Sequence, residues 1–381
     1  MSIKQDELVE DFTFKDLMKA YLDCRKRKRN TLSALQFEIQ LEKNLLILYR
    51  ELKNGTYKIG KSICFVVTSP KPREVWAANF RDRIVHHLIY NAIKDRFYKR
   101  FIKDSYSCIP NKGTLACAKQ MLIYSRKASC NYSKKVYFLK ADLSNFFVSI
   151  NKDILFKLLC KYVKEQWIIN LLKQVIYHDP KSCVYIKSGP KLMAKIPPYK
   201  SLWNSSDENG LPIGNLTSQF FSNVYLNELD QYVKNVLKCK FYCRYVDDLI
   251  ILSYSPSNLS DIARKISAFV SEFLALRFNP KKFFINLIEK GIDFVGFFIK
   301  PHRLLLRRRT IRKIFCIVKH WLNLENRYNF EIVSAFLHSI NSYLGMLINT
   351  IGYNLRREIC LLFNSLIIFP NENFSKAVIL Y

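Results

Sequence analysis

The chain has 381 residues and a large excess of basic side chains, with 61 Lys and Arg against 31 Asp and Glu, so its formal net charge is +30. A chain of this length can bury a large core, and we expect two or three subdomains. The charge exceeds what solubility requires, and it indicates a polyanionic partner such as a nucleic acid.

A basic protein of membrane surfaces is the main alternative. It is disfavoured because the basic residues are spread along the whole chain, and no stretch offers the ~18 uncharged apolar residues of a membrane span. The N-terminal segment 1–7 carries acids and lacks a signal-peptide core, so we expect an intracellular protein. The 11 cysteines contain no Cys-x-x-Cys spacing, which favours buried free thiols over zinc ligands or disulfides.

The first hundred residues alternate between helical and strand-like patterns. Apolar periodicity predicts a helix over 35–52, which Asn54-Gly55 ends, and a second helix over 80–100. Between them, the strand-like residues 62–68 lead into the basic segment 70–76, which we interpret as a hairpin. Such a hairpin could close over a triphosphate, whereas ordinary surface exposure is the alternative for any single basic residue in it.

Two apolar runs further along the chain each meet acidic residues. Residues 136–141 are strand-like and end at Asp142, and residues 241–252 read as a β-hairpin with Asp247 and Asp248 at its tip. Adjacent like charges repel unless a proton or a metal lies between them, and hard carboxylate oxygens suit Mg²⁺. A solvated turn is the alternative for the Asp-Asp pair alone.

If these two strands pair in one antiparallel sheet, Asp142 meets Asp247 and Asp248 at its rim. Three carboxylates would then hold two Mg²⁺ ions ~4 Å apart, one lowering the pKa of an attacking hydroxyl and the other neutralising the departing phosphate. The sequence therefore predicts nucleotidyl-transfer chemistry.

The remaining segments predict mostly helix. Phe146 is interpreted as core, and Phe147 as either core or a contact to an incoming sugar. Glycines in the loop 210–219 let the backbone approach a base or sugar closely, and Thr217 and Ser218 can cap the helix that follows. Further helices are expected over 157–177, 220–237 and 260–276, with an aperiodic insertion over 179–209 and a short hairpin over 291–298.

A helical region is expected from Arg307, Arg308 and Arg309 to about residue 364. Basic side chains on its faces, among them Arg356 and Arg357, would contact the phosphates of a nucleic-acid duplex.

The order of these motifs resembles the palm of a reverse transcriptase. The resemblance covers residues 62–364 and rests on Asp142, the Gly-Leu-Pro-Ile-Gly-Asn-Leu-Thr-Ser-Gln loop, Tyr-Val-Asp-Asp at 245–248, the lysines at 281–282 and Gly-x-Asp-Phe-x-Gly at 291–296. Within that superfamily the glycine loop is similar to that of diversity-generating retroelements of bacteria and phages. The segments 71–74, 80–83, 341–345 and 354–356 share this similarity.

The resemblance implies an α+β fold of the right-hand polymerase type. The expected parts are an N-terminal helical extension over 1–60, fingers over 61–135, a palm of antiparallel sheet and helices over 136–300 that includes the insertion, and a helical thumb over 301–381. No RNase H or endonuclease domain is expected.

The resemblance also implies roles for single residues. Asp142, Asp247 and Asp248 would bind two Mg²⁺ ions, with Mn²⁺ as an alternative, and Lys282 would donate a proton to pyrophosphate. Phe147 stands at the family's gate against ribonucleotides. The remaining nucleotide contacts would be Lys71 and Arg73 to the triphosphate, and Gly214 and Gln219 to the nascent base pair. Val148 and Phe283 depart from the residues that several relatives carry there.

The implied function is mutagenic copying of a dedicated template RNA into DNA from dNTPs in a diversity-generating retroelement. The enzyme would hold an RNA/DNA duplex, work with a small basic accessory protein, and act in the cytoplasm as a bacterial or phage-encoded protein. One alternative is an anti-phage defence reverse transcriptase that copies a non-coding RNA, with a second polymerase subunit as a partner. Another is a non-catalytic RNA-binding scaffold, which the intact acidic trio disfavours.

Overall fold

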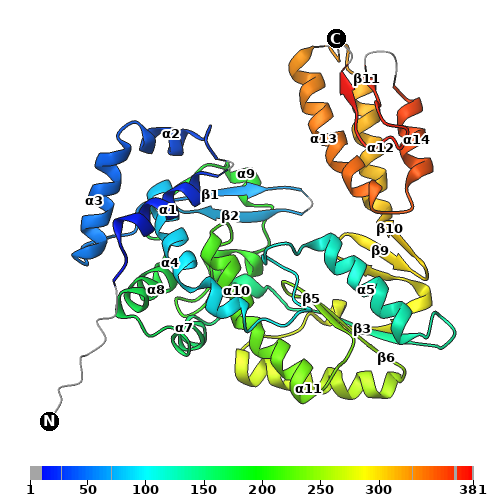
Figure 1. Ribbon diagram of the computed structural model, residues 1–381, viewed down its shortest axis with the longest axis horizontal. Coiled ribbons are helices and arrows are strands. Elements are labelled where there is room, and N and C mark those ends of the chain that lie inside the picture. Colours follow the sequence, from blue (N-terminus) through cyan, green and yellow to red (C-terminus); the bar gives the residue numbers. More distant parts are fainter. Residues whose placement is uncertain (1–10, 27, 70, 328, 364–366, 380–381) are drawn as a thin grey trace. The chain divides into compact units, whose positions relative to one another are not determined.

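The structure is a computed structural model that describes residues 11–26, 28–69, 71–327, 329–363 and 367–379. The chain forms two compact units, each built from three stretches of sequence (Figure 1). The first comprises Met1–Lys103, Leu143–Leu237 and Arg264–Asn279, and the second comprises Asp104–Asp142, Lys238–Ala263 and Pro280–Tyr381. The expected borders of extension, fingers, palm and thumb stay a prediction.

The first unit is mainly helical. A reciprocal capping box between Thr13 and Asp16 starts its first helix. Its main helices are α1 Phe14–Arg25, α2 Leu32–Glu38, α3 Leu41–Lys53, α4 Phe80–Tyr98, α7 Lys152–Cys160, α8 Gln166–Tyr177 and α10 Leu216–Gln231, with the single turn α6 at Phe146–Ser149.

Two of the predicted helices are each broken into two. The helix expected over 35–52 is divided between α2 and α3, because the Asn44 side chain donates to the carbonyl of Phe37 at 2.8 Å and satisfies the end of α2. The helix expected over 157–177 is divided between α7 and α8, where Arg96 binds both the Tyr162 carbonyl and the Glu165 carboxylate. In both places a side chain replaces the bonds that a continuous helix would make.

The predicted basic hairpin is present in the first unit. Strand β1 (Ser62–Val67) pairs antiparallel with β2 (Arg73–Ala77), although residue 70 lies outside the described residues. The insertion 179–209 is more ordered than expected, because β4 (Val184–Ile186) adds a parallel third strand to β1. The short helix α9 (Pro190–Met193) and two 3₁₀ turns follow β4.

The glycine loop packs tightly against β2. Gly214 has a φ of +132°, and a Cβ there would lie 2.9 Å from the carbonyl oxygen of Trp76, so only glycine fits. The following helix starts at Leu216 rather than at 220. Thr217 does not cap it, which corrects the expectation, because its Oγ1 lies 2.5 Å from Nδ1 of the buried His86. Ser218 is likewise buried inside the helix.

The second unit is organised around a four-stranded antiparallel sheet in the order β5-β6-β3-β7. The predicted strand and hairpin are confirmed as β3 (Tyr137–Asp142), β5 (Tyr242–Tyr245) and β6 (Asp248–Ser253), with β7 (Phe284–Leu287) on the outer side of β3. The helix α5 (Thr114–Ala128) packs against β5 and β6 (Figure 1). The amphipathic α11 (Pro256–Leu274) leaves β6 and runs from the second unit into the first.

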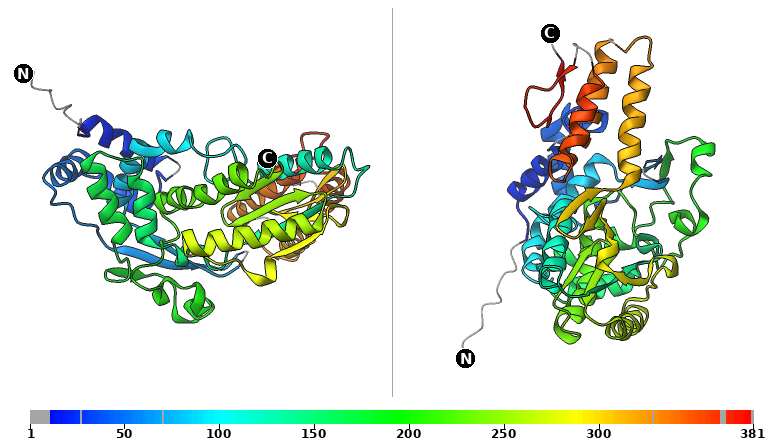
Figure 2. Two further views of the ribbon diagram at one scale, coloured as in Figure 1. Left: turned by 90° about the horizontal axis from the view of Figure 1, so that it is seen from below. Right: turned by 90° about the vertical axis from the view of Figure 1, so that its right-hand side faces the viewer.

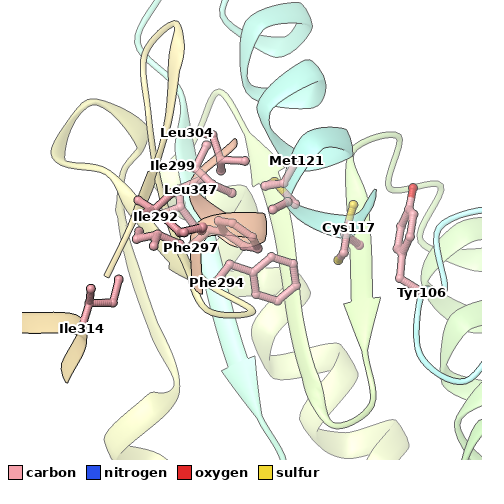
Figure 3. Packing of buried hydrophobic residues seen from close by; sticks show 14 of the residues in the cluster. Tyr106, Cys117, Met121, Ile292, Phe294, Phe297, Ile299, Leu304, Ile314 and Leu347 are labelled. Carbon is pink, nitrogen blue, oxygen red and sulfur yellow. The ribbon is translucent and has the colours of Figure 1, made fainter. Parts of the chain in front are cut away.

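A second sheet continues the predicted hairpin at 291–298. It contains β8 (Ile292–Phe294), β9 (Phe297–Lys300) and β10 (Arg303–Leu306), all antiparallel. Figure 3 shows side chains of α5, such as Met121, gathered with those of β8 to β10, such as Phe294 and Leu304, in one buried cluster. This apolar cluster fixes the acid-bearing sheet to its neighbours.

The expected helical region after Arg307 is present. Helices α12 (Arg308–Leu322) and α13 (Phe330–Ile348) lie side by side, and α14 (Tyr353–Leu361) packs on α13 (Figure 2). A two-stranded sheet of β11 (Ile367–Ile368) and β12 (Val378–Ile379) follows. Together with the antiparallel sheets, these helices confirm the α+β class.

The composition predicts buried free thiols and no membrane span. All 11 cysteines are free thiols, but the expectation that they are buried is only partly correct, since Cys108, Cys130, Cys183 and Cys316 are exposed. Within the described ranges, no helix is long and apolar enough to cross a membrane.

Candidate active site

The pairing of β3 with β6 places Asp142 directly opposite Asp248. Because side chains alternate between the faces of a strand, Lys140 lies on the same face as Asp142. Asp247 lies in the two-residue turn that joins Tyr245 to Asp248. The sequence prediction that the three acids meet at one end of an antiparallel sheet agrees with this register.

The turn itself has an uncommon backbone. Val246 has a φ of +54°, a region that β-branched residues rarely adopt. Two-residue hairpin turns require positive φ, and glycine or asparagine usually supplies it. A valine held in this conformation indicates that the surrounding structure imposes the turn, which is typical of functional sites.

The pKa of Asp248 is strongly raised. Burial raises its pKa to about 7, and the carboxylates of Asp142 and Asp247 act in the same direction, whereas Lys140 and Lys282 oppose them. Its Oδ1 atom is buried and has no hydrogen-bond partner among the described residues. A buried, unpaired carboxylate oxygen is unfavourable, and a bound cation would remove the cost.

Two lysines face the carboxylates. The Nζ atom of Lys282 lies 2.7 Å from Oδ2 of Asp142, and its side chain is 46 % exposed. The Nζ atom of Lys140 lies 3.9 Å from Oδ2 of Asp248 and donates a hydrogen bond to the carbonyl of Asp293. Sequence reasoning missed Lys140, although its position two residues before Asp142 on the same strand is a usable signal.

The predicted two-ion site can be tested against this arrangement. Among the described residues, no group of three or more His, Cys, Asp or Glu side chains is arranged to hold a metal ion. Lys282 donates a hydrogen bond to Oδ2 of Asp142, so this oxygen is already engaged by a cation. The donor chemistry nevertheless fits Mg²⁺, since Asp142 and Asp248 are register partners that offer hard carboxylate oxygens and Oδ1 of Asp248 lacks a partner among the described residues. Magnesium binding therefore stays a prediction.

The buried side chain of Arg244 stabilises the turn that contains Val246 and Asp247. The sequence patterns did not single out Arg244. Its side chain is buried, Nη1 donates to the Val246 carbonyl at 2.9 Å, and Nη2 donates to Oγ of Ser105 at 3.0 Å. Backbone bonds from Arg244 to Asp104 and from Tyr106 to Arg244 fix the same segments to each other. A charged residue inside an apolar strand, directly before an acidic turn, was the signal available in the sequence.

The predicted nucleotide-binding residues all belong to the first unit, whereas the acids belong to the second. Lys71 and Arg73 are exposed on the β1–β2 hairpin, and Gln219 is exposed near the start of α10. Phe147 is half-buried in α6, and its ring centroid lies 5.3 Å from that of Phe146, which is buried as expected. Their proposed contacts with a nucleotide remain predictions.

The five arginines predicted to bind a duplex differ in exposure and in their bonding partners. Arg308, Arg309 and Arg357 are exposed, whereas Arg307 forms an ion pair with Asp293. Arg356 is buried and donates to the carbonyls of Leu347 and Asn373, at 3.0 and 2.7 Å. This corrects the expectation for Arg356, because a buried guanidinium bound to backbone carbonyls stabilises the fold and is not available to a phosphate.

Replacing both Arg308 and Arg309 with Gln is expected to weaken binding to any primed RNA template. Removing one cation from a phosphate should reduce the slope of log affinity against log salt by roughly 0.7 to 0.9. Fluorescence anisotropy at several salt concentrations measures this slope. The matched control is Lys134→Gln with Lys135→Gln, which removes the same charge from an exposed loop of the same unit. Equal slopes for the two double variants would show that α12 makes no phosphate contact.

A sheet that brings three carboxylates to one end, beside two lysines, is typical of nucleotidyl transferases. Residues 68–299 match the family "Reverse transcriptase (RNA-dependent DNA polymerase)". Because this match spans more than half of the chain, the protein belongs to the reverse transcriptase family.

Three relatives are similar at low identity. Protein YkfC of Escherichia coli K12 is 23 % identical over 305 residues, which cover 71 % of this chain and 74 % of YkfC. The putative COX1/OXI3 intron 2 protein of Saccharomyces cerevisiae is 24 % identical over 271 residues, with 61 % and 31 % covered. An uncharacterised 91 kDa protein in the cob intron of Schizosaccharomyces pombe is 23 % identical over 214 residues, with 56 % and 23 % covered. The chain therefore spans less than a third of both fungal proteins.

Two solved telomerase structures are also similar. Apo telomerase of Candida tropicalis, truncated from its C-terminal domain, has a TM-score of 0.45 and 13 % identity, with 64 % of this chain and 54 % of that chain covered. Telomerase of Candida albicans in complex with a fragment of telomeric RNA has a TM-score of 0.44 and 13 % identity, with 80 % and 55 % covered.

Proposed function

We propose that the protein synthesises DNA from dNTPs on an RNA template by metal-dependent nucleotidyl transfer. The observation that carries this proposal is the register of Asp142 against Asp248, with Asp247 in the adjoining turn, in a chain of the reverse transcriptase family. Extension of a primer on an RNA template with Mg²⁺ and dNTPs tests it. Chelation of the metal with EDTA should abolish the extension, and extension that survives EDTA would contradict the proposal.

Each polar residue of the site has a distinct part in this reaction. Asp142, Asp247 and Asp248 would hold the ions, which when bound supply a lowered pKa for the primer hydroxyl and charge neutralisation at the leaving phosphate. The ammonium group of Lys282 contacts Asp142, and Lys282 would donate a proton to the departing pyrophosphate. Lys140 joins Asp248 to the Asp293 carbonyl and thereby limits the movement of the acid.

For the biological role we propose mutagenic copying of a dedicated template RNA in a diversity-generating retroelement. The support is the sequence of the glycine loop, which resembles that group. Misincorporation measured at each template base tests the role. Elevated errors opposite template adenine are expected, whereas equal error rates at all four bases would favour the anti-phage alternative.

Phe147→Ala is expected to increase the use of ribonucleotides while use of dNTPs changes little. Removing the half-buried ring would open space for a 2′-hydroxyl, and steric exclusion acts on the difference between two substrates. The measurement is the ratio of kcat/KM for dNTP and rNTP. Phe156→Ala is the control, because Phe156 is also half-buried in the first unit and packs on Tyr177. An unchanged ratio in Phe147→Ala would assign this ring to core packing alone.

A further inference from the structure

The first unit contains a polar groove of about 590 Å³ that the proposed chemistry does not use. Three stretches line it: 144–149 after β3, 198–209 of the insertion, and 275–277 after α11. Most of its side chains are serine or asparagine, and none of the lining residues is acidic. Its volume lies in the range of sites that enclose ligands of nucleotide size.

The walls of the groove are held in place by hydrogen bonds of the lining segments. The buried Glu74 of β2 accepts hydrogen bonds from Oγ of Ser201 and from the backbone N–H of Leu202, which fixes the insertion to the hairpin. Backbone bonds join Ser144 to Arg277 at 2.8 Å and Gly210 to Ile150 at 2.9 Å. The groove is therefore a built feature and not a gap between loosely packed loops.

Several side chains of the groove have no partner of their own. Within the part of the chain that the structure describes, the side chains of Ser144, Ser149 and Arg277 make no hydrogen bond or ion pair. Two lining residues other than glycine, Asn145 and Ala275, have a φ of +49°, which lies in the left-handed region. Left-handed backbone on two lining segments that a backbone bond joins, next to unpartnered polar side chains, indicates a surface shaped to bind a ligand.

The chemistry of the lining selects the class of ligand. Tyr199 is 63 % exposed, and Nζ of Lys200 lies over its ring at 5.5 Å from the ring centre, so a largely exposed aromatic ring carries a cation on one face. Unpaired RNA is recognised by aromatic stacking, by hydrogen bonds to base edges and the 2′-hydroxyl, and by cations at phosphates. Ser144 and Ser149 supply free hydrogen-bonding groups, Tyr199 the stacking surface, and Arg277 of the lining and Lys200 next to Tyr199 the cations.

We propose that this groove binds an unpaired stretch of RNA, with a base stacked on Tyr199 and a phosphate at Arg277. The proposal adds a second RNA contact to the proposed function and rests on it only for the class of partner. The positive charges of Arg277 and Lys200 disfavour a basic peptide as the partner. An acidic peptide would make no use of the Tyr199 ring or of the asparagine amides.

Binding of a labelled single-stranded RNA of mixed sequence to the full chain tests the groove. The assay is fluorescence anisotropy in EDTA, so that it needs neither catalysis nor metal. Tyr199→Ala should weaken binding about fivefold or more without changing the salt slope, because stacking releases no counterions. Arg277→Gln should reduce the salt slope by about 0.7, the value for one phosphate contact on a single strand.

Tyr185→Ala is the matched control, since Tyr185 is also an exposed tyrosine of the insertion and has Lys61 at 5.9 Å from its ring. If Tyr199→Ala and Tyr185→Ala bind RNA equally well, the groove does not hold RNA. If Tyr199→Ala instead loses a protein that co-purifies with wild type, the groove belongs to a protein partner. Equal weakening for a DNA strand of the same sequence would overturn the assignment to RNA. If primer extension fails while single-stranded RNA still binds the groove, the proposed function alone is contradicted.

Discussion

Asp248→Asn is expected to reduce single-nucleotide incorporation by at least about a hundredfold. The substitution keeps the shape of the side chain but removes a charged oxygen ligand, and metal ions contribute several kcal/mol to transition-state stabilisation in such sites. The decrease should appear in kcat more than in the KM for dNTP, because the carboxylate acts on charge that develops during the reaction.

The same variant should melt at a higher temperature than wild type when both are measured without metal. Asp248 is buried beside two other carboxylates, and its Oδ1 lacks a partner in the described residues, so its charge opposes folding there. Asp207→Asn is the control, since that side chain is 96 % exposed. Incorporation within tenfold of wild type by Asp248→Asn would remove this residue from the catalytic site.

Arg244→Met is expected to lower kcat strongly although Arg244 reaches no substrate. Its guanidinium bonds the Val246 carbonyl and Ser105, so its removal frees the turn that carries Asp247. Leaving buried acceptors unsatisfied costs about 1 to 3 kcal/mol each, which should also lower the melting temperature by several degrees. Arg244 is thus a positioning residue, and kcat should fall while the KM for dNTP changes little.

Two further variants separate this role from simple loss of stability. Arg244→Lys retains one donor and should recover part of kcat, whereas Arg126→Met removes an exposed guanidinium of the same unit and should leave both quantities unchanged. If Arg244→Met, assayed well below its melting temperature, keeps wild-type kcat, the turn does not depend on the arginine.

The acidic end of the sheet could be predicted because its signals are local. Two apolar runs end in acids, the side-chain period of strands is two, and pairing those runs brings Asp142 to Asp248. The partners of Arg244 and Lys140 could not be predicted in the same way. Ser105 and the carbonyl of Asp293 are 139 and 153 residues away along the chain, and only the fold brings them close.

The errors in the helices and in the loop have a common cause. Asn44 bonds a helix end, Arg96 binds the break before α8, and Thr217 turns to His86 rather than to its own helix end. Periodicity reports which face is apolar but not which side chain competes for a backbone group. Arg356 shows the same limit, because its sequence neighbourhood is basic while its side chain is buried against carbonyls.

The most direct measurement is primer extension on a mixed-sequence RNA template by the purified full chain, with Mg²⁺ and four dNTPs, beside Asp247→Asn prepared in the same way. If the rim carboxylates carry RNA-templated DNA synthesis, wild type should copy the template into DNA and Asp247→Asn should incorporate at least about a hundredfold more slowly. Equal extension by the two proteins, or product from wild type only with ribonucleotides, would contradict the account.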